Sequence, residues 1–254
     1  MLQTGNTMMQ RWQTRILLGA AGALLLLAGT RATAEGEAGF RPLFNGINLA
    51  GWWGKPEFWS VKDGVITGRT TPEQPTPRNT FLIWTNGTVR DFELRLAYRI
   101  TANNPQGFAN SGIQYRSKVV DRTHLVVAGY QADLEAGPNY SGILYEERGR
   151  GIMALRGQRV TFSPDNQKTI VGTVGDAAAM QAAIKTNDWN DYTIIAQGPH
   201  LRHFINGHLT VDVTDESTRG AQSGVIALQL HAGEPMTVEF KNIRLKPLRK
   251  AAAP

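Results

Sequence analysis

Short segments in which apolar and polar residues alternate recur along most of the chain. In one of them, apolar Phe92, Leu94 and Leu96 alternate with charged Glu93 and Arg95. Successive side chains of a strand point to opposite faces of a sheet, so this pattern predicts strands with one buried face. Segments that read as strands span residues 61–67, 92–100, 111–118, 129–135, 143–147, 192–196, 201–205, 209–213, 225–231 and 237–246.

Turn residues separate these segments and indicate how they connect. Asp63-Gly64 and Asn206-Gly207 are typical of two-residue hairpin turns, and Gly198-Pro199 marks a further turn. Many short strands joined by such turns predict an all-β fold, a two-sheet antiparallel sandwich built as one domain.

Two kinds of segment depart from the strand pattern. Residues 177–185 contain mostly acceptable or good helix formers and follow Asp176, which can cap the first turn, so they predict one short peripheral helix. Residues 69–78, with three prolines, and residues 148–166 predict long surface loops. Loops of this length often border a binding site.

The first 34 residues have the order of a secretory signal peptide. Two arginines precede an apolar run, residues 16–28, and Ala32-Thr33-Ala34 supplies the small-x-small pattern that precedes a cleavage site. The run is shorter than the roughly 18 residues of a membrane-spanning helix, and an uncleaved anchor is the alternative. We therefore expect cleavage after Ala34, export to the periplasm or the medium, no stable membrane anchor after cleavage, and one domain over residues 35–254.

Composition excludes several classes of function. The whole chain has 27 lysines and arginines against 21 acidic residues, and three of the arginines lie in the leader, which leaves a mature net charge of +3. No basic block with interleaved aromatic residues is present, so nucleic acid is not an expected partner. The absence of cysteine excludes disulfides, a thiol nucleophile and a cysteine-ligated metal. Nothing in the pattern specifies an oligomeric state.

Three of the expected strands carry polar side chains on the face opposite an apolar row. Strand alternation places these residues in pairs on one face: Gln114 with Arg116, Gln131 with Asp133, and Gln229 with His231. Such alternation is usual for the solvent face of an antiparallel sheet, which is the plain alternative. The choice of Gln, Asp, Arg and His over Lys, Glu and Thr favours a shallow polar groove instead.

Histidines and tryptophans elsewhere invite other interpretations. His200, His203 and His208 lie near the Asn206-Gly207 turn, where we expect them to face solvent or cap the turn rather than bind a metal. The aromatic group near the start of the domain is expected to seal one edge of the core rather than to form a sugar platform. Its members are Trp52, Trp53, Phe58 and Trp59.

Eight short segments, in the same order, give the chain a family resemblance. They are Leu43-Phe44-Asn45-Gly46 with Gly51-Trp52, residues 59–66, Asp91-Phe92-Glu93-Leu94, residues 110–116, residues 129–133, Trp189-Asn190-Asp191-Tyr192, Asn206-Gly207, and residues 224–231 followed by Phe240-Lys241-Asn242-Ile243. Over nearly its whole mature length the chain resembles the 3-keto-disaccharide hydrolase domain family. The resemblance implies a concanavalin-like jelly roll and a small carbohydrate as substrate.

The strand from Gly129 to Asp133 departs from the commonest form of that family. Many members read Gly-Tyr-Glu-Val-Gln, whereas this chain carries Gln131 and Asp133 and resembles the other common version, which also has the stretch Leu144-Tyr145-Glu146-Glu147. Gln131 can neither ionise nor attack, so the two-carboxylate mechanism of retaining glycosidases lacks one of its carboxylates.

The resemblance implies cleavage of 3-keto glycosides by elimination, in which a base removes the proton on C2 and the glycosidic oxygen leaves C1. The hypothesis assigns Asp133 or His231 as base, Arg116 to steady the enolate, and Glu146 or Tyr145 to assist the leaving oxygen. Gln131, Gln229, Gln114 and Asn110 are expected to bind substrate. No cofactor is required, although a divalent metal on Asp133, Glu146 or His231 could replace Arg116. The alternative from another class is a non-catalytic carbohydrate-binding module or lectin.

Overall fold

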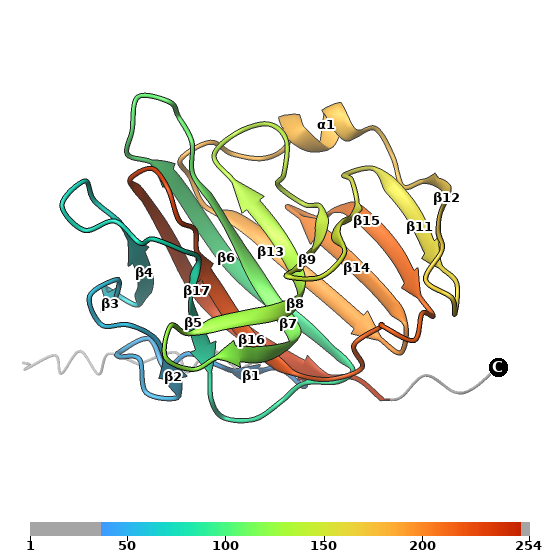
Figure 1. Ribbon diagram of the computed structural model, residues 1–254, viewed down its shortest axis with the longest axis horizontal. Coiled ribbons are helices and arrows are strands. Elements are labelled where there is room, and N and C mark those ends of the chain that lie inside the picture. The colour runs from blue at the N-terminus through green and yellow to red at the C-terminus, as the bar shows by residue number, and fades with distance from the viewer. Residues whose placement is uncertain (1–36, 250–254) are drawn as a thin grey trace, which may run out of the picture. The chain divides into compact units, whose positions relative to one another are not determined.

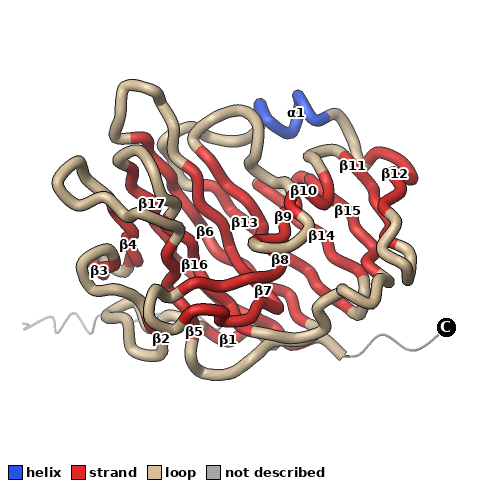
Figure 2. Tube along the Cα trace, in the orientation of Figure 1, coloured by secondary structure: helices blue, strands red, loops and turns tan. Residues whose placement is uncertain are grey.

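The structure is a computed structural model that describes residues 37–249. It is an all-β sandwich of two stacked sheets with one short helix at the side (Figure 1, Figure 2), which confirms the predicted fold class. The leader expected over residues 1–34 lies outside the described residues. Within residues 37–249, no helix is long and apolar enough to cross a membrane.

The larger sheet has ten strands, in the order β12-β11-β15-β14-β13-β6-β17-β4-β3, with β1 paired to β17. Its pairs are antiparallel except β11 with β15, which run parallel and depart from the all-antiparallel prediction. The strands are β1 (Arg41–Pro42), β3 (Trp59–Lys62), β4 (Val65–Arg69), β6 (Phe92–Ala102), β11 (Gln158–Phe162), β12 (Lys168–Thr173), β13 (Asn190–Gln197), β14 (His200–Ile205), β15 (His208–Asp215) and β17 (Met236–Pro247).

The smaller sheet has seven strands, in the order β10-β9-β8-β7-β16-β5-β2. The strands are β2 (Trp52–Trp53), β5 (Thr80–Trp84), β7 (Asn110–Asp121), β8 (Val126–Glu135), β9 (Leu144–Glu147), β10 (Gly151–Ala154) and β16 (Val225–Leu230). The strands that the sequence analysis singled out for polar residues, β7, β8 and β16, lie close together in this sheet, with β7 between the other two.

The core lies between the sheets and contains hydrogen bonds as well as apolar contacts. On β8, Tyr130, Ala132 and Leu134 are fully buried on the core side. Tyr130 donates a hydrogen bond of 2.5 Å from its hydroxyl to Oδ2 of Asp215 on the larger sheet. The hydroxyl of Tyr115 lies 2.9 Å from Nε2 of His203, which again joins β7 to the opposite layer.

His203 corrects the expectation that the histidines near the hairpin face solvent. Along β14 it shares the buried face with Leu201 and Ile205, alternating with half-buried positions, and its side chain is completely buried. Burial lowers the pKa of His203 to about 3, so the imidazole is neutral in the core. The alternation of residues along β14 indicates that His203 is buried. Its nearness to the turn was therefore the wrong basis for predicting its exposure.

Other departures from the sequence analysis concern unpredicted strands. Residues 148–166 were expected to form a loop, but β10 and β11 occupy much of this segment. Both form because the neighbouring strands β9 and β15 supply hydrogen-bonding partners. This pairing is a tertiary effect that cannot be predicted from the local sequence. Strands β5 and β12 were also missed: β5 is buried on both faces and β12 is exposed on both, so neither alternates.

The helix α1 spans Ala177–Ala182, inside the predicted range but shorter. Asp176 caps it by accepting a hydrogen bond of 2.8 Å from the backbone N–H of Ala178, as expected. The helix ends early because the side chain of Asn190 binds both backbone groups of Lys185, at 2.8 and 2.9 Å, in place of helical partners.

Replacing Leu134 by alanine should destabilise the protein by roughly 2–5 kcal/mol, as for a buried leucine. Its side chain has no exposed surface and packs in the main core. Chemical denaturation of Leu134→Ala and of the control Val171→Ala, at a half-exposed site on β12, measures the difference. Equal free energies of unfolding for the two variants would contradict the assignment of this face to the core.

Candidate functional site

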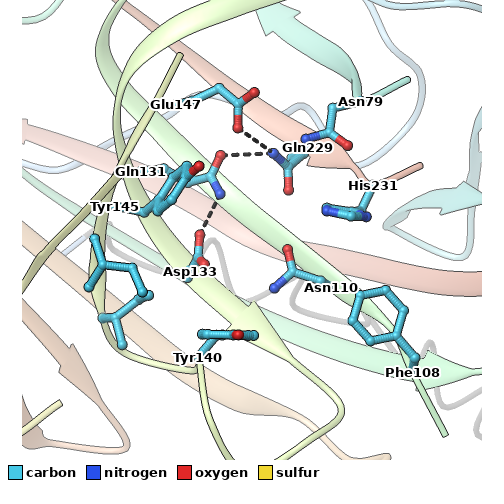
Figure 3. Close-up of a pocket in the computed structure, with 12 residues that line it drawn as sticks. Asn79, Phe108, Asn110, Gln131, Asp133, Tyr140, Tyr145, Glu147, Gln229 and His231 are labelled. Atoms are coloured by element: carbon cyan, nitrogen blue, oxygen red, sulfur yellow. Dashed lines mark hydrogen bonds between the residues drawn. The ribbon is translucent and has the colours of Figure 1, made fainter. Parts of the chain in front are cut away.

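A cavity of about 290 Å³ opens on the face of the smaller sheet that points away from the core (Figure 3). Strands β7, β8 and β16 form its floor, and β9 with the neighbouring loops forms its walls. The lining residues are Asn79, Phe108, Asn110, Gln131, Asp133, Tyr140, Ile143, Tyr145, Glu147, Ile152, Gln229 and His231. Six of the residues singled out from the sequence thus surround one cavity: Asn110, Gln131, Asp133, Tyr145, Gln229 and His231.

Gln131 is the centre of a row of hydrogen bonds across the floor. Its Oε1 accepts from the amides of Gln114 and Gln229, the latter at 2.9 Å, and its Nε2 donates to Oδ1 of Asp133. Two of these bonds are visible in Figure 3. Gly112 lies under the side chain of Gln131, where an added Cβ would come within 2.4 Å of it. The missing side chain at Gly112 therefore provides the space that this row requires.

This polar row is buried, so the plain alternative of a solvent-facing surface is wrong for these positions. Gln114 and Gln229 have no exposed surface, Gln131 retains 2% and Asp133 retains 5%. Buried polar groups are costly unless they are hydrogen-bonded, and this row satisfies most of its own donors and acceptors. Oε1 of Gln229 is the exception: it is buried without a partner, and it points toward the space between Asp133 and His231 (Figure 3).

Asp133 is held in its protonated form at neutral pH. Desolvation by burial raises the pKa of its carboxyl to about 8, with repulsion from Glu147 and Glu135 adding to the effect. Hydrogen bonds from Gln131 and Asn110 oppose the rise but do not cancel it. The Gln131 bond is accepted by Oδ1.

His231 is held as a neutral imidazole with a defined tautomer. Its Nδ1 lies 2.5 Å from the carbonyl oxygen of Ala232, which can only accept, so Nδ1 carries the proton and Nε2 keeps a free lone pair. Burial lowers the pKa of His231. The ring of Phe108 packs edge-on against the imidazole at 5.8 Å, and Asn79 binds the backbone N–H of Ala232 at 3.0 Å.

On strand β9, the side chains of Tyr145 and Glu147 line the cavity, and the side chain of Glu146 lies on the opposite face of the strand. Glu146 instead pairs with Arg150, Nε to Oε2 at 2.6 Å, in a buried cluster that includes Asp215. Of the two residues predicted as alternatives to assist the leaving oxygen, Tyr145 lines this cavity and Glu146 does not, since adjacent residues of a strand face opposite ways. Glu147 was missed, although the same alternation pairs it with Tyr145. Desolvation raises the pKa of Glu147.

Arg116 does not share the face of Gln114, which corrects the predicted site. The pairing of β7 with β8 shifts register between Tyr115 and Lys118, and Arg116 has a φ of 48°, so a β-bulge reverses the alternation there. The buried guanidinium donates to the carbonyl oxygens of Arg90 and Gly198, at 2.6 and 2.7 Å. It also pairs with Asp91 at 3.1 Å. Arg116 thus joins loops at one end of the sandwich.

Two aromatic residues in the walls could not be predicted from alternation because they lie in loops. Phe108 precedes β7, and Tyr140 lies between β8 and β9; both are more than a third exposed. The loop that carries Tyr140 is pinned by Glu135, whose carboxylate accepts from the backbone N–H groups of Asn139 and Tyr140. Within residues 37–249, no three histidine, aspartate or glutamate side chains converge as a metal site would require.

Comparison with known proteins identifies the family. The model for the 3-keto-alpha-glucoside-1,2-lyase-like domain matches residues 39–246, most of the chain. The chain belongs to this lyase-like family. Membership confirms the resemblance seen in the sequence and makes this a carbohydrate-active protein. No curated protein matches the chain.

Solved structures share the fold of this lyase-like domain at low sequence identity. A provisionally assigned glycosyl hydrolase from Parabacteroides distasonis is 18% identical, with a TM-score of 0.53 over 82% of this chain and 99% of that one. A Bacillus subtilis protein of unknown function with a galectin-like fold is 11% identical, with a TM-score of 0.55 over 83% of this chain and 96% of that one. These likenesses show a common fold.

Replacing Arg116 by alanine should destabilise the protein by about 3–5 kcal/mol, because the buried Asp91 would lose its closer cationic partner and the carbonyls of Arg90 and Gly198 would lose a donor. The control Lys118→Ala removes an exposed cation from the same strand. Urea denaturation compares the two free energies of unfolding. A loss for Arg116→Ala as small as that of the control would show that the buried pair has no structural role.

The raised pKa of Asp133 predicts a stability that declines with pH. The unfolded chain releases this proton near pH 4, but the folded protein retains it until about pH 8. Between these values the folded protein binds more protons, so its free energy of unfolding falls as pH rises. The Asp133→Asn variant lacks this pH-dependent contribution to the free energy of unfolding. Its stability should therefore rise relative to that of the parent as pH increases from 4 to 8.

Denaturation of both proteins across this pH range measures the effect, with Glu57→Gln, at an exposed site, as the control. A difference between parent and Asp133→Asn that does not change with pH would contradict a protonated Asp133.

Proposed function

We propose that this protein cleaves the glycosidic bond of 3-keto glycosides by elimination. The observation that carries the proposal is a neutral imidazole and a protonated carboxyl lining one cavity, His231 and Asp133, in a member of a lyase-like family. Groups whose environments hold them in opposite roles, one ready to take a proton and one ready to give it, are typical of acid–base catalysis.

His231 is the proposed base. Its Nε2 takes the proton from C2 of the sugar, which is acidic because the neighbouring C3 is a ketone, and the electron pair becomes an enolate. Because Nδ1 is committed to the carbonyl of Ala232, the imidazole presents its basic nitrogen and the ring cannot easily change tautomer. The lowered pKa keeps the base unprotonated at neutral pH.

Asp133 is the proposed acid. When the enolate collapses, the C3 carbonyl forms again, a double bond forms between C1 and C2, and the bond from C1 to the glycosidic oxygen breaks. The departing oxygen takes the proton from the carboxyl of Asp133. The products are an unsaturated keto sugar and the free alcohol, and addition of water across the double bond would complete a net hydrolysis.

The remaining groups of the cavity would hold the sugar. The unpartnered Oε1 of Gln229 can accept a hydrogen bond from a sugar hydroxyl. The amide of Asn110 and the hydroxyl of Tyr145 line the same space and can donate to the enolate oxygen and the substrate. Arg116 and Glu146 have no part in this scheme because their side chains are engaged elsewhere.

Two substitutions that preserve shape test the scheme with a 3-keto disaccharide as substrate. His231→Asn can keep a donor near the position of Nδ1 while removing Nε2, and Asp133→Asn keeps the acceptor for Gln131 while removing the acid. Each should lower kcat by on the order of a hundredfold or more. The parent's kcat should also decline as pH rises through about 8, where Asp133 loses its proton, and Asp133→Asn should lack that decline.

His200→Asn is the matched control, since His200 lies on the larger sheet and pairs with Asp212. Released monosaccharide is the readout for all variants. Near-normal turnover by His231→Asn and Asp133→Asn would refute the proposed site. Tight binding of the sugar by the parent without any turnover would identify a carbohydrate-binding module instead.

A further inference from the structure

A second cavity, of about 530 Å³, lies on the other side of Glu147 from the first. Glu147 lines both cavities, and the second is also bounded by Arg116 and Lys118 of β7, by Ala128 and Gly129 of β8, by residues 146–149 and by residues 218–223. The first cavity, at about 290 Å³, is at the lower limit of ligand sites, which span about 300–1,000 Å³. It has room for a single sugar ring, so the group joined to that ring must lie outside it.

The charges that face the second cavity are unbalanced. Three exposed cations line it, Lys118, Arg148 and Arg219, and none of them forms an ion pair or side-chain hydrogen bond with another described residue. Two further charged residues line this cavity, and each already has a partner of opposite charge: Arg116 pairs with Asp91, and Glu146 pairs with Arg150.

Among the described residues, Glu147 is the one acidic group lining the second cavity that forms no salt bridge, although the charge of Arg148 partly opposes the rise of its pKa. Its carboxyl already accepts from Gln229 at 3.4 Å. Burial favours its neutral form. The cavity therefore offers more positive charge than its own residues neutralise. Clefts with an excess of one charge attract ligands of the opposite charge.

We infer that the second cavity binds the aglycone, and that it selects aglycones that carry a carboxylate or a phosphate. The inference rests on the proposed function for the identity of the first cavity as the sugar site. Lys118 approaches from β7, Arg148 from the end of β9 and Arg219 from the loop before β16, so an acidic group in the cavity would meet cations from three segments.

Binding of matched glucosides tests the selection without any need for turnover. The ligands are 4-carboxyphenyl glucoside and its neutral amide, 4-carbamoylphenyl glucoside, both with an ordinary hydroxyl at C3 so that elimination is impossible. By calorimetry the acid should bind at least about fivefold more tightly than the amide, the ratio that one exposed ion pair can supply. The ratio should shrink as salt rises.

The double variant Lys118→Gln/Arg219→Gln should bring the ratio close to one while leaving the affinity for the amide unchanged. Lys62→Gln, which removes an exposed cation from β3 of the other sheet, is the control and should keep the parent's ratio. A phosphorylated aglycone in a third titration distinguishes the two anions. Equal affinity of the parent for acid and amide, or an unchanged ratio in the double variant, would overturn the inference.

Turnover of the corresponding 3-keto glucosides separates this inference from the proposed function. If the amide is cleaved by the parent but the acid has no advantage in kcat/KM, only the selection is wrong. If neither is cleaved and the acid still binds more tightly, the proposed elimination is wrong and the anion site stands.

Discussion

Desolvation of the polar row on the smaller sheet is the constraint on which the site depends. Strand β8 is buried on both faces, so the side chains of Gln131 and Asp133 are surrounded mostly by protein atoms instead of water. Such groups persist in a folded protein only if they are hydrogen-bonded or uncharged. Gln131 meets the first condition through three side-chain partners. Asp133 meets the second by keeping its proton, which is the property that the proposed elimination requires of its acid.

The core supports this row from beneath. The backbone carbonyl of Asp133 accepts from the hydroxyl of Tyr192 at 3.4 Å, and His203 lies 3.3 Å from the carbonyl of Ile143, a residue of the cavity wall. Both side chains belong to the larger sheet. The stacking of the two sheets therefore helps to set the backbone positions of the site, and the tyrosine and histidine contacts hold the layers in register. A rigid support of this kind is what precise proton transfer requires.

Strand alternation predicted most of the fold and four of the twelve residues that line the cavity, because the period of two is a local property of the chain. It places Gln131, Asp133, Gln229 and His231 on one side of the sheet, where the structure has them. It failed at Arg116, where a bulge reverses the faces, and a bulge depends on partner strands that the local sequence does not show. Phe108 and Tyr140 lie in loops without periodicity, and the burial of the polar row depends on loops and walls that only the folded chain brings together.

The arrangement suits elimination better than the displacement used by ordinary glycosidases. Displacement needs two carboxyl groups on opposite sides of the bond, one of them charged, and a site in which burial favours the neutral forms of Asp133 and Glu147 opposes that charge. Proton abstraction beside a ketone needs no charged nucleophile. A neutral imidazole can begin it, the developing charge spreads onto the keto oxygen, and a buried carboxylic acid can end it. The burial that opposes a charged nucleophile is therefore compatible with the proposed elimination.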